Sequence, residues 1–504
     1  MAQAKNTTPA QTAVTGNKHH AALAAAKRQK TRSIVVTVAV ILVAALILVP
    51  LGMFANGSIY RTLTAASVKD VKYKVADYNY YFTTAYLNMY QTIQSTYGDY
   101  ASMIINPSEP LNKQQFSEEQ TWADYFKTQA IDTMRNQAML LKESQAAGFT
   151  LSAEQQEELK TLIDSVDLAA ANYGYTTQAY LSASYGGGMT KAIMERCLTR
   201  SYTAQCYGES VLDGLTYTQE QLQARYDQNP AAYDTVTFHS YVIPLKEAEG
   251  QDAEALKAAA KVVADDMAAK VHDTASYADY VRTLVTEEEL SSYEDDTATL
   301  RSHVSLSTVS SQEYGSWLFQ DDRKAGDTYV AETTDSYQVI MFVEREDTHY
   351  NVVTVRHILI TPETAEDETE PSQAAWDAAK AEAESLLAEW KAGEHTEESF
   401  GALADEHTAD TGSSGGLYEE IHHGQMVPAF DDWCFAKHNP GDTGIIRSNY
   451  GYHVMYFVSE GEEYWTQTLT AELRNEDYAA WQAEKLENYP IKTNAAVLRL
   501  GRHS

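Results

Sequence analysis

Three short motifs have residue types and spacings that could carry chemistry. Residues 412–416 read GSSGG and fit the G-x-S-x-G pattern of serine hydrolases, but that pattern needs a preceding strand, and here a helical segment precedes it. His422 and His423 are adjacent and lack the HExxH or Cys/His spacing of a metal site. Residues 186–188 read GGG between two helical segments, which indicates a turn rather than a phosphate cradle. None of the three therefore favours hydrolysis, metal chemistry or nucleotide binding.

The composition excludes further classes of protein. The chain has 504 residues, with 38 basic and 71 acidic side chains and a net charge of −33, which disfavours nucleic acid as a partner. Its three cysteines, Cys197, Cys206 and Cys434, are too few and too scattered for a disulfide framework or a four-thiolate zinc site. At roughly 150 residues per domain, the length predicts about three folded units.

The N-terminal region has the pattern of a membrane anchor. Residues 1–33 carry six basic and no acidic residues, and residues 34–54 form an uncharged apolar run of 21 residues. A membrane-spanning helix needs about 20 apolar residues, whereas the apolar core of a cleaved signal peptide, the rival interpretation, has about 7 to 15. We therefore expect a disordered cytoplasmic tail over 1–33, a transmembrane helix over 34–54 and an extracytoplasmic remainder.

Helical periodicity follows the apolar run. Residues 68–75 alternate like a short strand, and residues 60–230 are otherwise expected to form a helical domain. Capping boxes at Ser117 with Gln120 and at Ser152 with Gln155 predict the starts of two helices. The many tyrosines there suggest helix packing with hydroxyls at the surface, or else a groove for unfolded chains. Residues 466–495 are also helical in pattern and are expected to pack back on this domain.

The second half of the chain contains one unit twice. VTFHSYVI at 236–243 matches VTVRHILI at 353–360 with an offset of 117, and YQVIMFV at 337–343 matches YHVMYFV at 452–458 with an offset of 115. Each copy reads as a strand, a long alanine-rich helix, a shorter helix and a final strand. The sequence thus predicts an α+β protein with two tandem α/β units, at 235–346 and 350–460.

The second unit resembles the parvulin family of peptidyl-prolyl cis/trans isomerases. The resemblance rests on six segments in the family's order: VRHILI (355–360), ESFGALADEHTAD (398–410), GGL (415–417), GQMVPAFDDWCF (424–435), PGDTG (440–444) and YGYHVMYFV (450–458). The whole layout resembles extracytoplasmic foldases of the PrsA and SurA type, with an anchor or signal, a helical chaperone domain, parvulin units and a closing C-terminal helix.

The resemblance implies a site without a cofactor or a metal. It places the catalytic residues at His357, Asp410 and His453, and the residues that grip the proline ring at Leu417, Met426 and Phe430. The family usually has Gly-Asp-Leu-Gly and an aromatic residue near Leu417, whereas this chain reads GGLYE over 415–419, which leaves the role of Tyr418 open.

The reaction needs a site that binds a twisted amide. An X-Pro bond rotates over a barrier near 20 kcal/mol without any bond being broken, so differential binding suffices. Met426 and Phe430 would form an apolar cup from one helical face at i and i+4. His357 and His453 are expected to hydrogen-bond each other, and Asp410 is expected to have a raised pKa and to donate a hydrogen bond.

The first unit loses these groups. In the self-alignment, Ser240 stands at the position of His357, Gln338 at that of His453, Ser310 at that of Met426 and Tyr314 at that of Phe430. We therefore predict that the first unit is a degenerate, catalytically silent copy. His239, one position before Ser240, is expected to be an ordinary strand residue.

These patterns together predict a membrane-anchored, extracytoplasmic peptidyl-prolyl isomerase that assists the folding of secreted proteins. The alternative is a holdase that binds unfolded chains through its helical domain and carries a vestigial isomerase site. The expected partners are unfolded or newly secreted proline-containing polypeptides and the membrane, reached through residues 34–54, with no nucleic acid. The sequence leaves a homodimer open.

Overall fold

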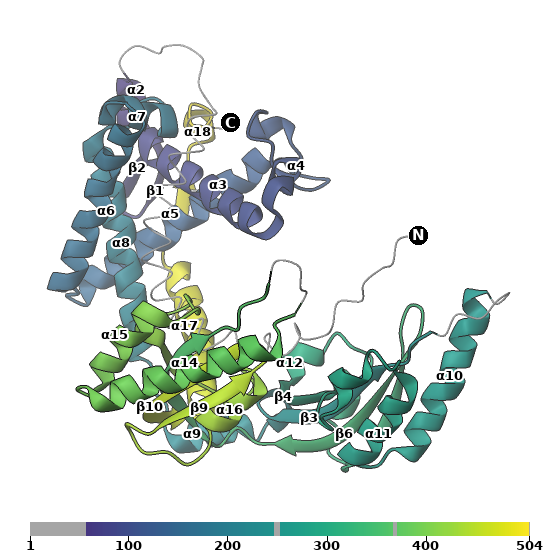
Figure 1. Cartoon of the computed structure of the whole chain (residues 1–504). Coiled ribbons are helices and arrows are strands. Elements are labelled where there is room, and N and C mark those ends of the chain that lie inside the picture. The colour runs from purple at the N-terminus through teal and green to yellow at the C-terminus, as the bar shows by residue number, and fades with distance from the viewer. Residues whose placement is uncertain (1–56, 246–251, 366–369, 503–504) are drawn as a thin grey trace. The chain divides into compact units, whose positions relative to one another are not determined.

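The computed structural model describes residues 57–245, 252–365 and 370–502 (Figure 1). The chain divides into two compact units, one over residues 217–471 and one that joins residues 57–216 to residues 472–502. The expected cytoplasmic tail over 1–33 and the expected anchor over 34–54 lie outside the described residues. Among the residues that are described, none of the helices combines the length and apolarity needed to span a bilayer.

The unit that contains the N-terminal half is mainly helical. Its helices are α2 (Ser58–Thr62), α3 (Val75–Tyr97), α4 (Ala101–Ile104), α5 (Trp122–Ala146), α6 (Ala153–Asn172), α7 (Thr177–Tyr185) and α8 (Lys191–Gly214). The predicted capping box of α6 is confirmed, because Ser152 and Gln155 bond reciprocally. The predicted start of α5 at Ser117 is wrong: Thr121 caps this helix by accepting from the Asp124 amide at 3.2 Å.

Residues from both ends of the described chain complete this unit. The expected single strand over 68–75 is instead a hairpin of β1 (Thr64–Val68) and β2 (Val71–Lys74), with Lys69 at φ 50° in the turn. The strand β11 (Ile491–Thr493) pairs antiparallel with β1 on its other edge. It follows α17 (Tyr464–Glu487) and precedes α18 (Ala495–Leu498). A salt bridge of 2.7 Å between Lys485 and Glu143 also ties α17 to α5.

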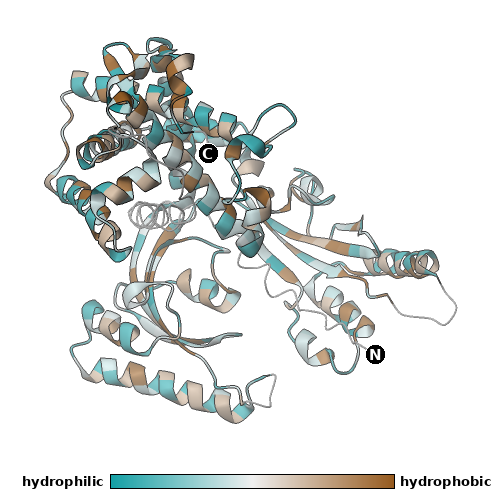
Figure 2. Cartoon of the chain, turned by 90° about the horizontal axis from the view of Figure 1, so that it is seen from above, coloured by the Kyte–Doolittle hydropathy of each residue, from teal (hydrophilic) through white to brown (hydrophobic). Residues whose placement is uncertain are grey.

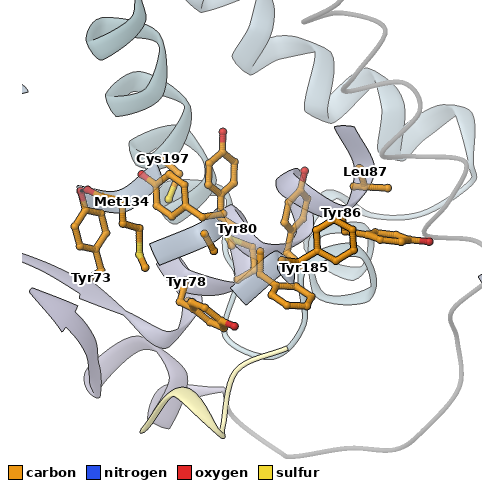
Figure 3. Packing of buried hydrophobic residues seen from close by; sticks show 14 of the residues in the cluster. Tyr73, Tyr78, Tyr80, Tyr86, Leu87, Met134, Tyr185 and Cys197 are labelled. Carbon is orange, nitrogen blue, oxygen red and sulfur yellow. Dashed lines mark hydrogen bonds between the residues drawn. The ribbon is translucent and has the colours of Figure 1, made fainter. Parts of the chain in front are cut away.

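Tyrosine rings fill the core of the helical unit (Figure 3). Tyr73 and Tyr78 are fully buried, and the ring of Tyr80 stacks on that of Tyr185 with centroids 5.9 Å apart. The Tyr73 hydroxyl donates to the carbonyl oxygen of Met134 at 2.8 Å. The rings therefore pack as expected, but the hydroxyls of these buried tyrosines do not reach the surface.

The unit over 217–471 contains two four-stranded antiparallel sheets of the same topology (Figure 1). The first has the order β4-β3-β6-β5, from β3 (Thr235–Val242), β4 (Leu300–Ser305), β5 (Thr328–Glu332) and β6 (Tyr337–Glu346). The second has the order β8-β7-β10-β9, from β7 (Asn351–Ile360), β8 (Leu417–Ile421), β9 (Thr443–Ser448) and β10 (Gly451–Glu463). In both, the first and last strands of the unit lie at the centre.

Each sheet carries helices on both faces. In the first copy, α10 (Ala253–Lys270) and α11 (Thr274–Leu284) cover one face, and α12 (Leu306–Val309) and α13 (Gly315–Leu318) lie on the other. In the second, α14 (Gln373–Ala392) and α15 (Glu397–His407) cover one face, and α16 (Pro428–Cys434) covers the other. The helix α9 (Gln219–Tyr226) precedes the first sheet. Figure 2 shows that these helices mix apolar and hydrophilic residues, as expected for elements with one buried side.

Candidate active site

Two buried histidines lie on the central strands of the second sheet. His357 on β7 stands opposite Met455 on β10, and His453 on β10 stands opposite Leu359 on β7. Met455 packs in the apolar cluster beneath α16, and residues directly opposite share one face of a sheet. The imidazole rings, 3% and 5% exposed by residue, therefore meet on the α16 face, where their Nδ1 atoms are 3.2 Å apart.

Further polar groups extend this contact into a chain. His357 Nε2 lies 3.0 Å from Asp410 Oδ2, and the Tyr418 hydroxyl donates to the same oxygen at 2.7 Å. At the other end, His453 Nε2 lies 2.7 Å from the Ser448 hydroxyl. The network thus runs from Ser448 through both imidazoles to Asp410.

The ionised carboxylate gives this network a direction. Because an ionised carboxylate can only accept, His357 donates to Asp410 from Nε2. The contact between the two Nδ1 atoms then needs one of them to donate to the other. Burial, together with the nearby His357, lowers the pKa of His453 to about 4. The arrangement holds polar groups in fixed positions.

Asp410 is fixed by the turn that follows α15. The Ala409 amide donates to the Leu359 carbonyl oxygen at 2.8 Å, and the Asp410 amide donates to the Thr408 hydroxyl at 3.1 Å. The hydrogen bond from His357, together with those from the Gly412 amide and the Tyr418 hydroxyl, holds the pKa of Asp410 well below its usual range despite partial burial. The expected raised pKa is therefore wrong: three donors stabilise the anion and outweigh desolvation.

An aromatic ring closes over the histidines. Phe430 is 2% exposed, and its ring stands edge-on to those of His357 and His453, with centroids 5.1 and 5.5 Å away. Met426 packs, half-buried, in the same cluster. The two do not share a helical face, because α16 begins at Pro428 and Met426 lies in the preceding turn. They reach the same cluster from a turn and a helix.

The structure brings Tyr418, and not Leu417, to the site. Leu417 stands opposite Arg356 on β7, whereas Tyr418 stands opposite Val355, which belongs to the cluster beneath α16. The two side chains therefore lie on opposite faces of the sheet. The pairing becomes irregular only beyond these two residues, between Tyr418 and Ile421 on β8. Sequence reasoning left Tyr418 open and missed Ser448, whose place at the end of β9, directly before the turn to β10, was the available signal.

The first sheet keeps the geometry with different groups. Ser240 stands opposite Ile340 and Gln338 opposite Val242, the same register as His357 and His453. The Gln338 amide donates to the Ser240 hydroxyl at 2.6 Å. His239 points to the other face, where its ring stacks on Tyr277 and burial lowers its pKa to about 4.

Comparison with known proteins identifies the second sheet. Residues 337–460 match the family model described as the PPIC-type PPIase domain, in which PPIase stands for peptidyl-prolyl isomerase. This segment is a PPIC-type PPIase domain. The match contains His357, Asp410, Phe430 and His453, and it confirms the predicted parvulin-type identity. Its first residues, from 337, form β6 of the preceding sheet, so the PPIC-type match extends beyond the second sheet itself.

Proteins similar to the chain support the same identity. The foldase protein PrsA 1 of Listeria innocua is 32% identical over 114 residues, which cover 22% of this chain and 32% of that protein. The foldase protein PrsA of Caldanaerobacter subterraneus is 28% identical over 158 residues, covering 31% of this chain and 44% of that protein. The chain thus spans less than half the length of these relatives. Both relatives are named foldases.

A solved structure is also similar in part. Its title describes PEB4 and Cj1289 of Campylobacter jejuni as two structurally related SurA-like chaperones. The match is 14% identical and covers 79% of this chain and 91% of that chain. Its TM-score of 0.19 is too low to establish a common arrangement.

Proposed function

We propose that the PPIC-type domain catalyses cis/trans isomerisation of peptidyl-prolyl bonds and that the chain acts as a foldase for secreted proteins. The observation that carries the proposal is the network of His357, His453 and Asp410 beneath Phe430, within the segment that matches the family. An X-Pro rotation needs an apolar contact for the ring and fixed polar groups near the amide, away from bulk water. Buried imidazoles next to an anchored carboxylate, capped by an aromatic ring, meet that need.

The cellular setting is part of this proposal. The uncharged run over 34–54 would anchor the chain in the membrane, and the basic residues before it would stay in the cytoplasm. The domain would then meet newly secreted, proline-containing polypeptides outside the cytoplasm. We also propose that two copies of the chain can pair at the membrane. Support comes from the apolar run and from the names of the PrsA relatives.

An exchange experiment tests the catalytic part. Magnetisation-transfer NMR on a proline-containing peptide would measure cis/trans exchange with and without the full chain. We expect acceleration by the wild type and a loss of about tenfold or more in Met426→Ala, because the adaptable thioether contributes to the apolar contact. Ser310→Ala, at the aligned and exposed position of the first copy, is the matched control and should leave the rate unchanged. No acceleration by the wild type would reject the proposal.

Holdase activity is a second candidate, favoured by one observation. Between α3 and α5 of the helical unit, several large apolar side chains are exposed: Tyr97 by 54%, Tyr100 by 68%, Met103 by 81%, Ile104 by 38% and Phe116 by 40%. Exposed apolar side chains of this size are typical of interaction surfaces. Suppression of client aggregation that survives Met426→Ala but falls in Tyr100→Ser/Met103→Ser would support this activity.

A further inference from the structure

A cluster of two imidazoles and a carboxylate lies between the two sheets of the 217–471 unit, away from the isomerase network. His303 comes from β4 of the first sheet, His423 from the turn before α16, and Asp431 from α16 itself. One ligand atom from each lies within 4.8 Å of the other two. In the part of the chain that the structure describes, this is the one group of three or more such side chains with that spacing.

His303 is oriented from behind by a second carboxylate. Its Nδ1 lies 3.0 Å from Glu346 Oε2 at the end of β6, and its Nε2 faces Asp431 Oδ2 at 3.9 Å. His303 also has φ 52°, a left-handed conformation that few residues with a side chain adopt. A carboxylate on the outer nitrogen of a histidine is the arrangement that fixes the ring and its tautomer in metal sites.

Asp431 and His423 are held just as firmly. Asp431 is 5% exposed, and its Oδ1 accepts from the Gly424 amide at 3.1 Å, which leaves Oδ2 for His423 Nδ1 at 2.8 Å. The His423 ring lies between Phe435 and His303, with centroids 3.6 and 4.3 Å away. Gly424, at φ 79°, lets the two copies approach, because a Cβ there would meet the His303 carbonyl oxygen at 3.0 Å. The protein therefore holds the three ligand atoms, one each from His303, His423 and Asp431, in place without a bound ion.

The set of ligands selects the class of ion. Imidazole nitrogens suit first-row transition metals, and a site of two histidines and one carboxylate is a known zinc arrangement that leaves a fourth position open. Bonds of 2.0 to 2.1 Å in a tetrahedron place neighbouring ligand atoms about 3.3 Å apart. The spacings of 2.8 and 3.9 Å around Asp431 Oδ2 bracket that value. The half-buried imidazoles leave access from solvent.

We infer that His303, His423 and Asp431 bind a divalent transition-metal cation of the zinc class, with Glu346 as the carboxylate that positions His303. The bound ion would link β4 of the silent copy to α16 of the PPIC-type domain. Asp431 follows Phe430 in α16, so the ion would fix the helix that places the aromatic ring over the histidines. Binding itself does not depend on isomerase activity.

Metal titration of the full chain tests the inference. Protein prepared without a histidine tag and treated with chelator would be titrated with Zn²⁺ in a calorimeter. We expect one saturable site whose affinity falls at least tenfold in His303→Ala and in His423→Ala, and about tenfold in Glu346→Gln, because outer carboxylates usually contribute that much. His272→Ala removes a histidine of the first copy whose side chain is 74% exposed, and should leave the affinity unchanged.

A spectroscopic readout on the unmodified chain guards against variants that fail to fold. Bound Co²⁺ should show visible absorption of tetrahedral or five-coordinate intensity, and one equivalent of Zn²⁺ should abolish it. Zn²⁺ should also raise the thermal midpoint of the wild type and not that of folded His423→Ala. Equal affinity in wild type and His303→Ala, or a Co²⁺ spectrum typical of a hydrated ion, would overturn the inference.

Discussion

The two sheets of the 217–471 unit share strand order and register but differ at one buried pair. His357 and His453 in the second sheet correspond to Ser240 and Gln338 in the first, and a side-chain polar contact joins each pair. Both copies therefore satisfy a polar pair at the same place on their central strands. In the second copy the pair continues to the carboxylate of Asp410, whereas in the first copy Gln338 hydrogen-bonds the Tyr314 hydroxyl. The fold requires that buried polar side chains at this place have hydrogen-bond partners. Any catalytic role depends on the groups around the pair, because function resides in the site and not in the fold.

The two copies also differ at the positions of Phe430 and Met426. Phe430 stands edge-on to both histidines, whereas its counterpart Tyr314 packs against Phe238 with centroids 5.9 Å apart. Met426 is half-buried in the site cluster, whereas its counterpart Ser310 is exposed. The position of Met426 therefore carries an apolar side chain only in the second copy.

The largest expected effect comes from removing His357, and the matching change in the first copy serves as its control. His357→Ala deprives Asp410 and His453 of their shared partner, so we expect kcat/KM for a proline peptide to fall about 100-fold, or about 2.7 kcal/mol. Ser240→Ala removes the matching group of the first copy and should leave kcat/KM unchanged. The exchange assay measures both, with circular dichroism to verify folding. A comparable loss in Ser240→Ala would show that the first copy takes part in catalysis.

A smaller effect is expected at the carboxylate of Asp410. Asp410→Ala removes both acceptor oxygens, whereas Asp410→Asn keeps one and turns an amide toward a donor. We expect a loss of about 30-fold for alanine and about tenfold for asparagine, since a hydrogen bond to a charged group contributes about 1.5 to 3 kcal/mol. Isomerisation rates measured at neutral pH compare the two variants with the wild type. Full activity in Asp410→Asn would mean that the negative charge has no role.

The smallest effect concerns stability against pH. The pKa of His453 falls from 6.5 to about 4 on folding, so the unfolded chain binds a proton that the folded chain does not. Stability should therefore decrease as pH falls from 6.5 to 4, with at most about 1.4 kcal/mol per pH unit from this group. His453→Gln, which copies Gln338, should flatten the curve by one proton, while His239 continues to contribute. Denaturant unfolding at several pH values measures the slope, and an unchanged slope would contradict a neutral His453.

The sequence predicted the repeat and the central strands well because they depend on long apolar runs. The offsets of 117 and 115 correspond to the observed registers of Ser240 and His357, and His357, Asp410, Met426, Phe430 and His453 come together as the resemblance implied. Leu417 does not join them, because the register of β8 against β7 decides which of two adjacent side chains faces the site.

Charge and helix boundaries were harder to foresee. The low pKa of Asp410 depends on the hydrogen bond from His357 and on those from the Gly412 amide and the Tyr418 hydroxyl, which only the folded loop brings near. The cap of α5 at Thr121 rather than Ser117 likewise depends on a turn in which the Ser117 amide donates to the Gln120 carbonyl oxygen. Such local competition between equivalent polar residues is not visible in a pattern of residue types.

The pairing of β11 with β1 has a consequence for the order in which the chain acquires structure. Residues 57–216 obtain their partner strand and the Lys485 contact only when residues 472–502 have been made, whereas each four-stranded sheet is complete within one continuous stretch. At about 5 to 20 residues per second of synthesis, the helical half waits roughly 10 to 50 s for its last pieces. The sheets can therefore mature first, and a truncated product would carry a finished PPIC-type domain beside an unfinished tyrosine-rich bundle.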